Sequence, residues 1–169
     1  MINNILYATD LGLYAPYLLQ HVILLASRHG AKVHAVHAIE PLGVFAESIL
    51  ATYMPPEQVN SLRNKGYKDV MSTIKEQVSS SFQDELTECS CDVGLIDDVQ
   101  VLRGKPADVI LESAAHCKAD LIVLGSNSQP TEPPSLGSVT MHVLTRSAVP
   151  VYMVPMAKLR NPLNFDRYK

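Results

Sequence analysis

The chain has 169 residues, of which 47% are apolar and 18% are charged, and its formal net charge is -3. These values are typical of a folded domain with a buried core, and they argue against intrinsic disorder. The negative charge argues against nucleic acid or an anionic membrane as a partner, because both require a basic protein surface. The longest apolar run, residues 22–26, is too short to cross a bilayer, and residues 1–4 lack the charge of a secretory signal. We therefore expect a cytoplasmic protein.

The first three predicted elements form a β-α-β unit. Residues 3–8 read as a short apolar strand that ends before Thr9, and residues 14–29 carry the broad apolar face of a helix. Gly30 closes this helix, because glycine adopts the left-handed C-terminal conformation without steric cost. Residues 32–39 read as the second strand. A right-handed crossover makes the two strands parallel.

The middle of the chain is expected to hold two more helices and a third strand. Residues 44–53 read as a short helix that the prolines at 55–56 end, and apolar side chains at spacings of three and four predict a long helix over 67–82. Residues 93–102 return to a strand pattern, which the acid pair Asp97-Asp98 interrupts as at a sheet edge or a bulge. For this acid pair, the pattern favours a solvated turn over a cation site.

The last third of the chain alternates two helices with two strands. Pro106 suits the first turn of a helix, which continues as an apolar stripe to residue 115. Residues 121–124 are a continuous apolar strand, residues 137–146 a helix and residues 149–154 the fifth strand. Continuous apolar strands occur where helices cover both faces of a parallel sheet. The sequence therefore predicts an α/β fold with a doubly wound, five-stranded parallel sheet and a ligand edge at the carboxyl ends of its strands.

The cysteines and histidines favour no metal site. Cys89, Cys91 and Cys117 read as reduced cytosolic thiols, and a strained bridge or a shared metal at the first two is the alternative. His34 and His37 are expected on one face of a strand, where packing or solvent contact is favoured over a metal pair because no third ligand lies nearby in the sequence. No catalytic residue is predicted, since the serines lack a nucleophile elbow.

Residues 121–140 carry the strongest functional signal. An apolar strand runs into Gly125, and a loop rich in proline and hydroxyl side chains then leads to Gly137-Ser138, where a helical pattern begins. A strand, a glycine loop and a helix N-terminus together place backbone N–H groups where they can bind a phosphate. A plain helix start, capped by Ser138 or Ser135, is the alternative.

Five segments in order resemble the universal stress protein (UspA-like) family, and the resemblance extends over residues 5–155. Residues 5–10 resemble the family's first strand with its terminal aspartate, and residues 37–40 resemble the end of its second strand. Residues 104–110 resemble the start of its third helix, and residues 119–126 resemble its fourth strand. Residues 136–139 and 149–151 resemble its closing helix and strand. The resemblance implies an adenine nucleotide alpha hydrolase-like fold with helices on both faces of a sheet of order 3-2-1-4-5.

The glycine loop departs from that family's ATP-binding signature, which is glycine, two residues, glycine, nine residues, then glycine with serine or threonine. Gly125 fills the first position and Gly137-Ser138 the last, but Ser128 stands at the second glycine and the span is one residue short. Serine restricts close backbone approach, three prolines between 130 and 134 remove amide donors, and Glu132 repels phosphate. These departures favour AMP or a smaller adenosine compound over fully wrapped ATP.

The resemblance also implies which residues hold the nucleotide. Asp10 would accept hydrogen bonds from the ribose or the adenine edge, Ala38 would contact the base through its main chain, and Leu124 would line its pocket. A helix cap is the alternative for Asp10. The candidate nucleotide-binding residues are Ala8, Thr9, Asp10, Ala38, Leu124, Gly125, Ser126, Ser128, Gly137, Ser138, Val139 and Thr140. No metal is expected apart from Mg²⁺ carried by a nucleotide.

Three functions remain open. The chain is a stress-response sensor or regulator in which AMP or ATP shifts loop 126–136, a dimeric interaction protein without nucleotide that acts on an unknown protein partner, or a weak ATPase. The third is least favoured, because no lysine lies in a phosphate loop, and we do not expect an enzyme. The resemblance implies a homodimer through residues 151–154, whose apolar edge would otherwise be exposed. We expect a single domain over 1–155 and a C-terminal tail over 156–169.

Overall fold

The structure, a computed structural model, describes residues 1–12, 14–40, 48, 52–57, 72, 76–77, 80, 93–128 and 135–156. Most of the helices expected over 44–53 and 67–82 lies outside this set, but those of their residues that are described are helical, namely Ser48, Thr52, Tyr53, Ser72, Glu76, Gln77 and Ser80. Cys89, Cys91, loop residues 129–134 and residues 157–169 also lie outside it, so the predictions made for them stay predictions.

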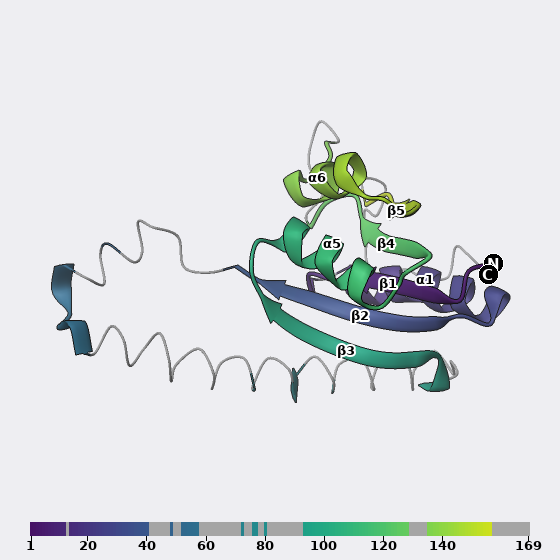
Figure 1. Ribbon diagram of the computed structural model, residues 1–169, viewed down its shortest axis with the longest axis horizontal. Coiled ribbons are helices and arrows are strands. Elements are labelled where there is room, and N and C mark those ends of the chain that lie inside the picture. Colours follow the sequence, from purple (N-terminus) through teal and green to yellow (C-terminus); the bar gives the residue numbers. More distant parts are fainter. Residues whose placement is uncertain are drawn as a thin grey trace.

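Five strands form one parallel sheet in the order β3-β2-β1-β4-β5 (Figure 1). They are β1 (Asn4–Ala8), β2 (Lys32–Ile39), β3 (Ile96–Arg103), β4 (Leu121–Gly125) and β5 (Val151–Val154). The strand order reverses at β1, which pairs in parallel with both β2 and β4. In such sheets the crevice at the carboxyl ends of the strands on either side of this reversal is the usual ligand site. The predicted fold class and strand order are confirmed.

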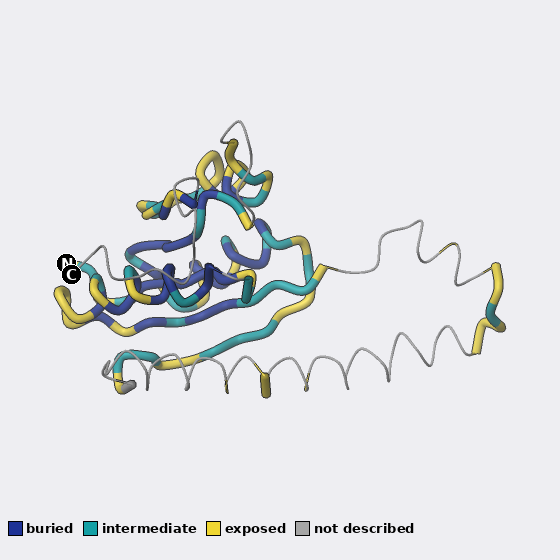
Figure 2. The backbone as a smooth tube through the Cα atoms, turned by 180° about the vertical axis from the view of Figure 1, so that it is seen from behind, coloured by how far each residue is buried: buried dark blue, intermediate teal, exposed yellow. Residues whose placement is uncertain are grey.

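Helices cover both faces of the sheet, α1 on one face and α5 with α6 on the other (Figures 1 and 2). They are α1 (Ala15–His29), α5 (Pro106–His116) and α6 (Ser138–Arg146). Successive side chains of β1 lie on opposite faces of the sheet, because side chains alternate along a strand. Ile5 and Tyr7 pack with α1, and Leu6 and Ala8 pack with α5 and α6. None of the described helices is long and apolar enough to span a membrane.

Local signals set the helix ends as predicted. Gly30 ends α1 in the left-handed conformation, with φ of 64°, and the amide of the next residue, Ala31, donates to the carbonyl of Ala26 at 2.9 Å. Pro106 opens α5, where its missing N–H costs nothing and its fixed φ suits the first turn. Gly30 thus leads into the start of β2 at the amino edge of the sheet, whereas Pro106 starts α5 at the carboxyl edge, in the pocket described below.

The strand predicted over 93–102 begins later, because η2 (Val93–Leu95), a turn of 3-10 helix, precedes it. Its register with β2 shifts next to His34, which leaves Asp97 bulged in an edge strand, as the acid pair predicted. The solvated turn expected there is wrong. Asp97 and Asp98 lie within β3, and the Asp97 carboxylate accepts a hydrogen bond from Lys32 Nζ at 2.8 Å.

The two histidines of β2 do not share a face, contrary to the prediction. They are three residues apart, and an odd separation places side chains on opposite faces of a strand. His34 Nδ1 lies 3.8 Å from the Asp97 carboxylate, whereas His37 Nδ1 lies 2.9 Å from the backbone oxygen of Thr9. A paired metal site on this strand is therefore excluded by geometry.

Candidate functional site

A pocket of about 260 Å³ opens at the carboxyl ends of β1 and β4, where the strand order reverses. It draws its wall from strands and helices that are distant in sequence. The wall consists of Ala8, Thr9, Asp10, Tyr14, Leu18, Val36, His37, Ala38, Pro106, Ile110, Leu124, Gly125, Asn127, Ser128, Gly137, Ser138, Val139, Thr140 and Met156. The structure therefore brings every candidate residue except Ser126 into one wall.

The turn after β1 presents Asp10 to the pocket. Asp10 Oδ1 accepts a hydrogen bond from the Gly12 amide at 2.9 Å, and Thr9 Oγ1 accepts one from the Leu11 amide at 3.1 Å. The residue that caps α1 is Tyr14, and no side chain hydrogen-bonds to that helix end, so the helix-cap alternative for Asp10 is wrong. In the described part of the chain Asp10 Oδ2 has no hydrogen-bond partner, which leaves it available to a ligand.

Ser126 lies behind the pocket wall and joins three segments. Its amide donates to the Val154 carbonyl at 2.8 Å, its carbonyl accepts from the Gly137 amide at 2.9 Å, and its hydroxyl accepts from the Met156 amide at 2.9 Å. The side chain is buried and its polar groups are used. Ser126 therefore fixes the ends of β5 and the start of α6, and the described geometry gives it no direct ligand contact.

The N-terminus of α6 offers three unused backbone donors. The first intrahelical bond runs from the Met141 amide to the Gly137 carbonyl at 3.0 Å, so the amides of Ser138, Val139 and Thr140 have no intrahelical acceptor. The N-cap is Gly137, without a side-chain hydrogen bond, so the alternative of a cap at Ser138 or Ser135 is wrong. Uncapped amides at the positive end of a helix are suited to an anion.

Other groups at this helix start are already engaged. The Gly137 amide donates to Ser126, and the Thr140 hydroxyl donates to the Gly125 carbonyl at 2.8 Å. Both glycines also allow close packing, because a Cβ at Gly125 would lie 3.1 Å from Met156 Cε and one at Gly137 would lie 3.3 Å from Asn127 Oδ1. The glycines thus serve the packing of the wall, a role that the loop pattern did not reveal.

Eight wall residues were not predicted, and they come mainly from α1, the end of β2 and α5. They are Tyr14, Leu18, Val36, His37, Pro106, Ile110, Asn127 and Met156. The sheet topology could have pointed to them. Ligands bind at the carboxyl ends of the strands beside the strand reversal, and the end of β2 and the first turn of α5 lie at this edge. Met156 lies beyond the last strand, where no pattern in the sequence points to it.

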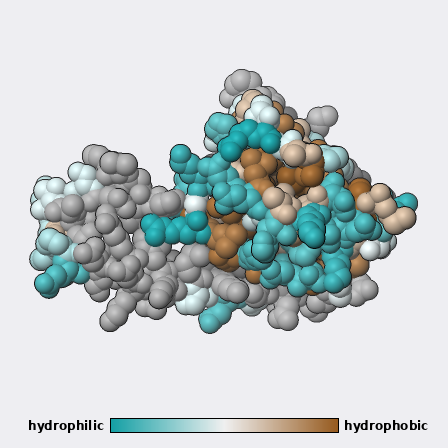
Figure 3. Space-filling view, viewed as in Figure 1, coloured by the Kyte–Doolittle hydropathy of each residue, from teal (hydrophilic) through white to brown (hydrophobic). Residues whose placement is uncertain are grey.

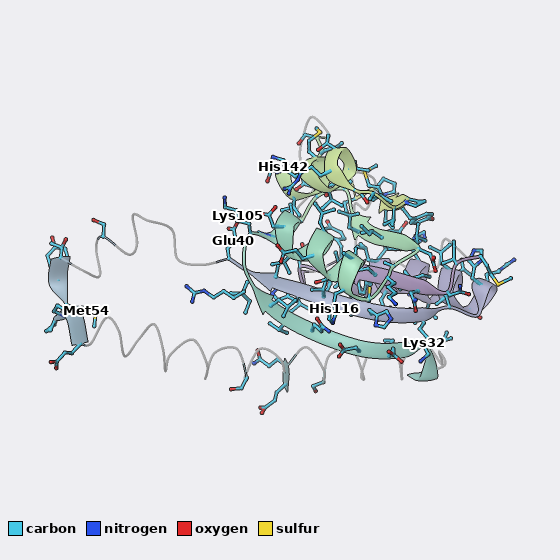
Figure 4. The ribbon with its side chains drawn as sticks, in the orientation of Figure 1. Lys32, Glu40, Met54, Lys105, His116 and His142 are labelled. Atoms are coloured by element: carbon cyan, nitrogen blue, oxygen red, sulfur yellow. The ribbon has the colours of Figure 1, made fainter. Side chains whose placement is uncertain are left out.

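The wall is mostly apolar and carries little charge. Its described residues include the carboxylate of Asp10 and no lysine or arginine. Glu40 and Lys105 lie at the same end of the sheet, and Lys32 lies at the opposite end (Figure 4). In the described residues no three side chains of histidine, cysteine, aspartate or glutamate gather as a metal site.

The chain is similar to known proteins over nearly its whole length. A family model described as the universal stress protein family matches residues 1–155. Universal stress protein MJ0577 from Methanocaldococcus jannaschii is 26% identical over 156 residues, which cover 91% of this chain and 95% of that protein. The solved structure of hypothetical protein MJ0577 has a TM-score of 0.63 at 27% identity and covers 92% of this chain and 96% of that one.

Two further solved structures share the fold at lower identity. Universal stress protein UspA from Lactobacillus plantarum has a TM-score of 0.67 at 18% identity, with 90% of this chain and 97% of that chain covered. A universal stress protein in complex with cAMP has a TM-score of 0.55 at 21% identity, with coverage of 91% and 97%. Together with the family match over residues 1–155, these findings show that the chain belongs to the universal stress protein family.

Proposed function

We propose that this chain is a stress-response regulator that binds an adenine mononucleotide in the pocket between β1 and β4. The observation that carries the proposal is the convergence of Asp10, the end of β2 and the uncapped start of α6 on one cavity. Its volume, about 260 Å³, lies just below the roughly 300–1,000 Å³ of typical ligand pockets, which suits a small ligand. A relative of the same fold, solved with cAMP, supports the choice of an adenine compound.

The charges of the wall favour one phosphate over three. The anion-binding groups are the amides of Ser138, Val139 and Thr140, and the helix end contributes a partial charge of about +0.5. The described wall has no cationic side chain to neutralise further phosphates. We therefore expect AMP, or a cyclic or smaller adenosine compound, to bind more tightly than ATP.

The test removes one backbone donor and leaves the helix intact. Ser138→Pro deletes the first amide of α6, a position where proline is well tolerated, and Gly137 before it is already extended at φ −63° and ψ 150°. The matched control, Ser138→Ala, keeps the amide and removes the hydroxyl. Calorimetric titration of AMP should show about tenfold weaker binding to the proline variant, as for a charge-assisted hydrogen bond, with little change in the control.

Adenosine provides the second control, because it lacks the phosphate. Its affinity should be the same for the wild-type chain and for the proline variant. If the wild-type chain binds neither AMP, cAMP, ADP nor ATP, the proposed function is wrong. Equal loss of adenosine and AMP in the proline variant would instead show that the substitution damages the pocket as a whole.

A dimeric interaction protein is the second candidate, and the surface at β5 favours it. β5 has a single partner in the described sheet, and its Tyr152 is 38% exposed. Met141 and Leu144 of α6 are also exposed, at 47% and 40%. Apolar residues gather over α6 and β5 in the space-filling view (Figure 3). We propose that a second copy covers this edge. The cytoplasmic location, the single domain and the lack of enzyme activity stay predictions.

A further inference from the structure

His37 is the one imidazole among the described residues of the pocket wall, and its orientation is set by a backbone contact. Its Nδ1 lies 2.9 Å from the carbonyl oxygen of Thr9, in a partly buried position. A carbonyl oxygen only accepts hydrogen bonds, so Nδ1 must carry the proton that is donated. In the neutral ring the other nitrogen, Nε2, then has a free lone pair and acts as an acceptor.

The second nitrogen, Nε2, has no partner among the described residues. No hydrogen bond or ion pair involves His37 Nε2 in the described part of the chain, and His37 is one of the residues that line the cavity. Asp10 Oδ2, which is also unpartnered, belongs to the same wall. The end of β2 and the turn after β1 therefore both present acceptors to the cavity. Such a wall suits a part of the ligand that is rich in donors.

We propose that His37 determines specificity at this site, because its Nε2 accepts a hydrogen bond from a donor on the bound nucleoside. This inference rests on the proposed function. A nucleoside carries two kinds of donor, the ribose hydroxyls and the exocyclic amine, and a neutral acceptor recognises both. A site built to hydrogen-bond such a group discriminates against analogues that lack it, since the protein acceptor is then left unpaired.

An asparagine at this position separates the structural role of His37 from the recognition role. The amide nitrogen of asparagine can replace Nδ1 and still donate to the Thr9 carbonyl, but nothing replaces Nε2. His37→Asn should therefore keep the unfolding temperature of the wild-type chain and lose the ligand contact. His37→Ala removes both groups and provides the comparison for the loss of the Thr9 contact.

The experiment measures the dissociation constants of AMP, 2′-deoxy-AMP, 3′-deoxy-AMP and IMP for the full chain and for His37→Asn. AMP should bind the asparagine variant about twofold to tenfold more weakly, the range that one neutral hydrogen bond supplies. The loss should disappear for the one analogue that lacks the recognised donor, because the cycle isolates that pair. IMP identifies the amine, and the two deoxy compounds identify the hydroxyl.

Two results would overturn the inference while the proposed function survives. One is wild-type affinity for AMP in the asparagine variant, which would limit His37 to holding Thr9. The other is an equal loss for all four ligands, which would show a general change in the pocket. Failure of the wild-type chain to bind any of the four would remove the proposed function itself, and this inference with it.

Discussion

Gly30 and Lys118, both outside the site, show what a side chain costs in a left-handed backbone conformation. Both follow a helix and both are left-handed, with φ of 64° and 51°, but only the first is glycine. At Lys118 the turn closes with the Ala119 amide donating to the Ala114 carbonyl at 2.8 Å, as Ala31 does to Ala26 after α1. A side chain in this conformation costs about 1–2 kcal/mol.

Lys118→Gly should therefore stabilise the protein by about 1 kcal/mol, and Gly30→Ala should destabilise it by a similar amount. A Cβ at Gly30 would have no neighbour within 4 Å, so the cost there comes from the backbone alone. Urea denaturation of both variants measures the change. Opposite signs are required, and a loss of stability in the glycine variant would show that the lysine side chain contributes more than its strain.

Ser126 is expected to be more important for stability than for direct ligand contact. Ser126→Ala leaves the Met156 amide without its acceptor in a buried position, which costs about 1–3 kcal/mol of the free energy of unfolding. The matched control is Ser128→Ala, because Ser128 is an exposed wall residue for which no side-chain hydrogen bond is described. Chemical denaturation should show a lower free energy of unfolding for Ser126→Ala and little change for Ser128→Ala. Equal stability of both variants would contradict the role given to Ser126.

At the scale of elements, β1 is fastened at its start by a carboxylate from the turn before β4. Asp120 accepts hydrogen bonds from the amides of Asn3 and Asn4 at 2.7 Å and 3.0 Å. These two backbone donors lower the pKa of the Asp120 carboxyl, because they stabilise its ionised form. The folded state therefore holds its proton less tightly than the unfolded state does.

This shift predicts an acid-sensitive contribution to stability. The stabilisation is fully present above the pKa of an unfolded aspartate, about 3.9, and is lost as the pH falls through the lowered folded value. Asp120→Asn should reduce the unfolding temperature at pH 7 and flatten its decline below about pH 4. Thermal melts from pH 7 to pH 2 test this. If the unfolding temperature of Asp120→Asn falls at low pH as steeply as that of the wild-type chain, other carboxylates cause the fall.

The edge strand β5 gives a prediction about assembly. Tyr152→Glu places a charge on its exposed apolar surface, which should separate a dimer that forms there. Tyr152→Phe keeps the ring and removes only the hydroxyl, which lies 3.4 Å from His21 Nδ1. Sedimentation should report two chains for the wild-type and phenylalanine forms and one chain for the glutamate form. A wild-type chain that is single at every concentration would end this proposal.

At the scale of the whole molecule, the fold could be predicted because its signals are local. Continuous apolar strands, the glycine after α1 and the proline at the start of α5 each report on a few neighbouring residues. The candidate site was located for the same reason, since the end of each strand is visible in the sequence. The family resemblance then supplied the strand order, which the observed sheet confirms.

What could not be predicted depends on packing between distant segments. Ser126 was expected at the ligand, but its three hydrogen bonds reach residues 11 to 30 positions away, and no periodicity reports such contacts. Met156 enters the wall two residues after β5, where its amide donates to Ser126 Oγ. The wrong capping role for Asp10 has a local origin, since a residue that can cap a helix can equally bond within a neighbouring turn, as Asp10 does to the Gly12 amide.

The bulge at Asp97 has a consequence for how far assembly can proceed. It interrupts the regular backbone pattern of β3, and the acid pair adds charge there, which are two ways in which proteins protect an outer strand from pairing. β5 carries neither device. If two copies meet edge to edge at β5, each has used the one unprotected edge strand of the described sheet. Growth into a filament is then blocked, and the stoichiometry stops at two.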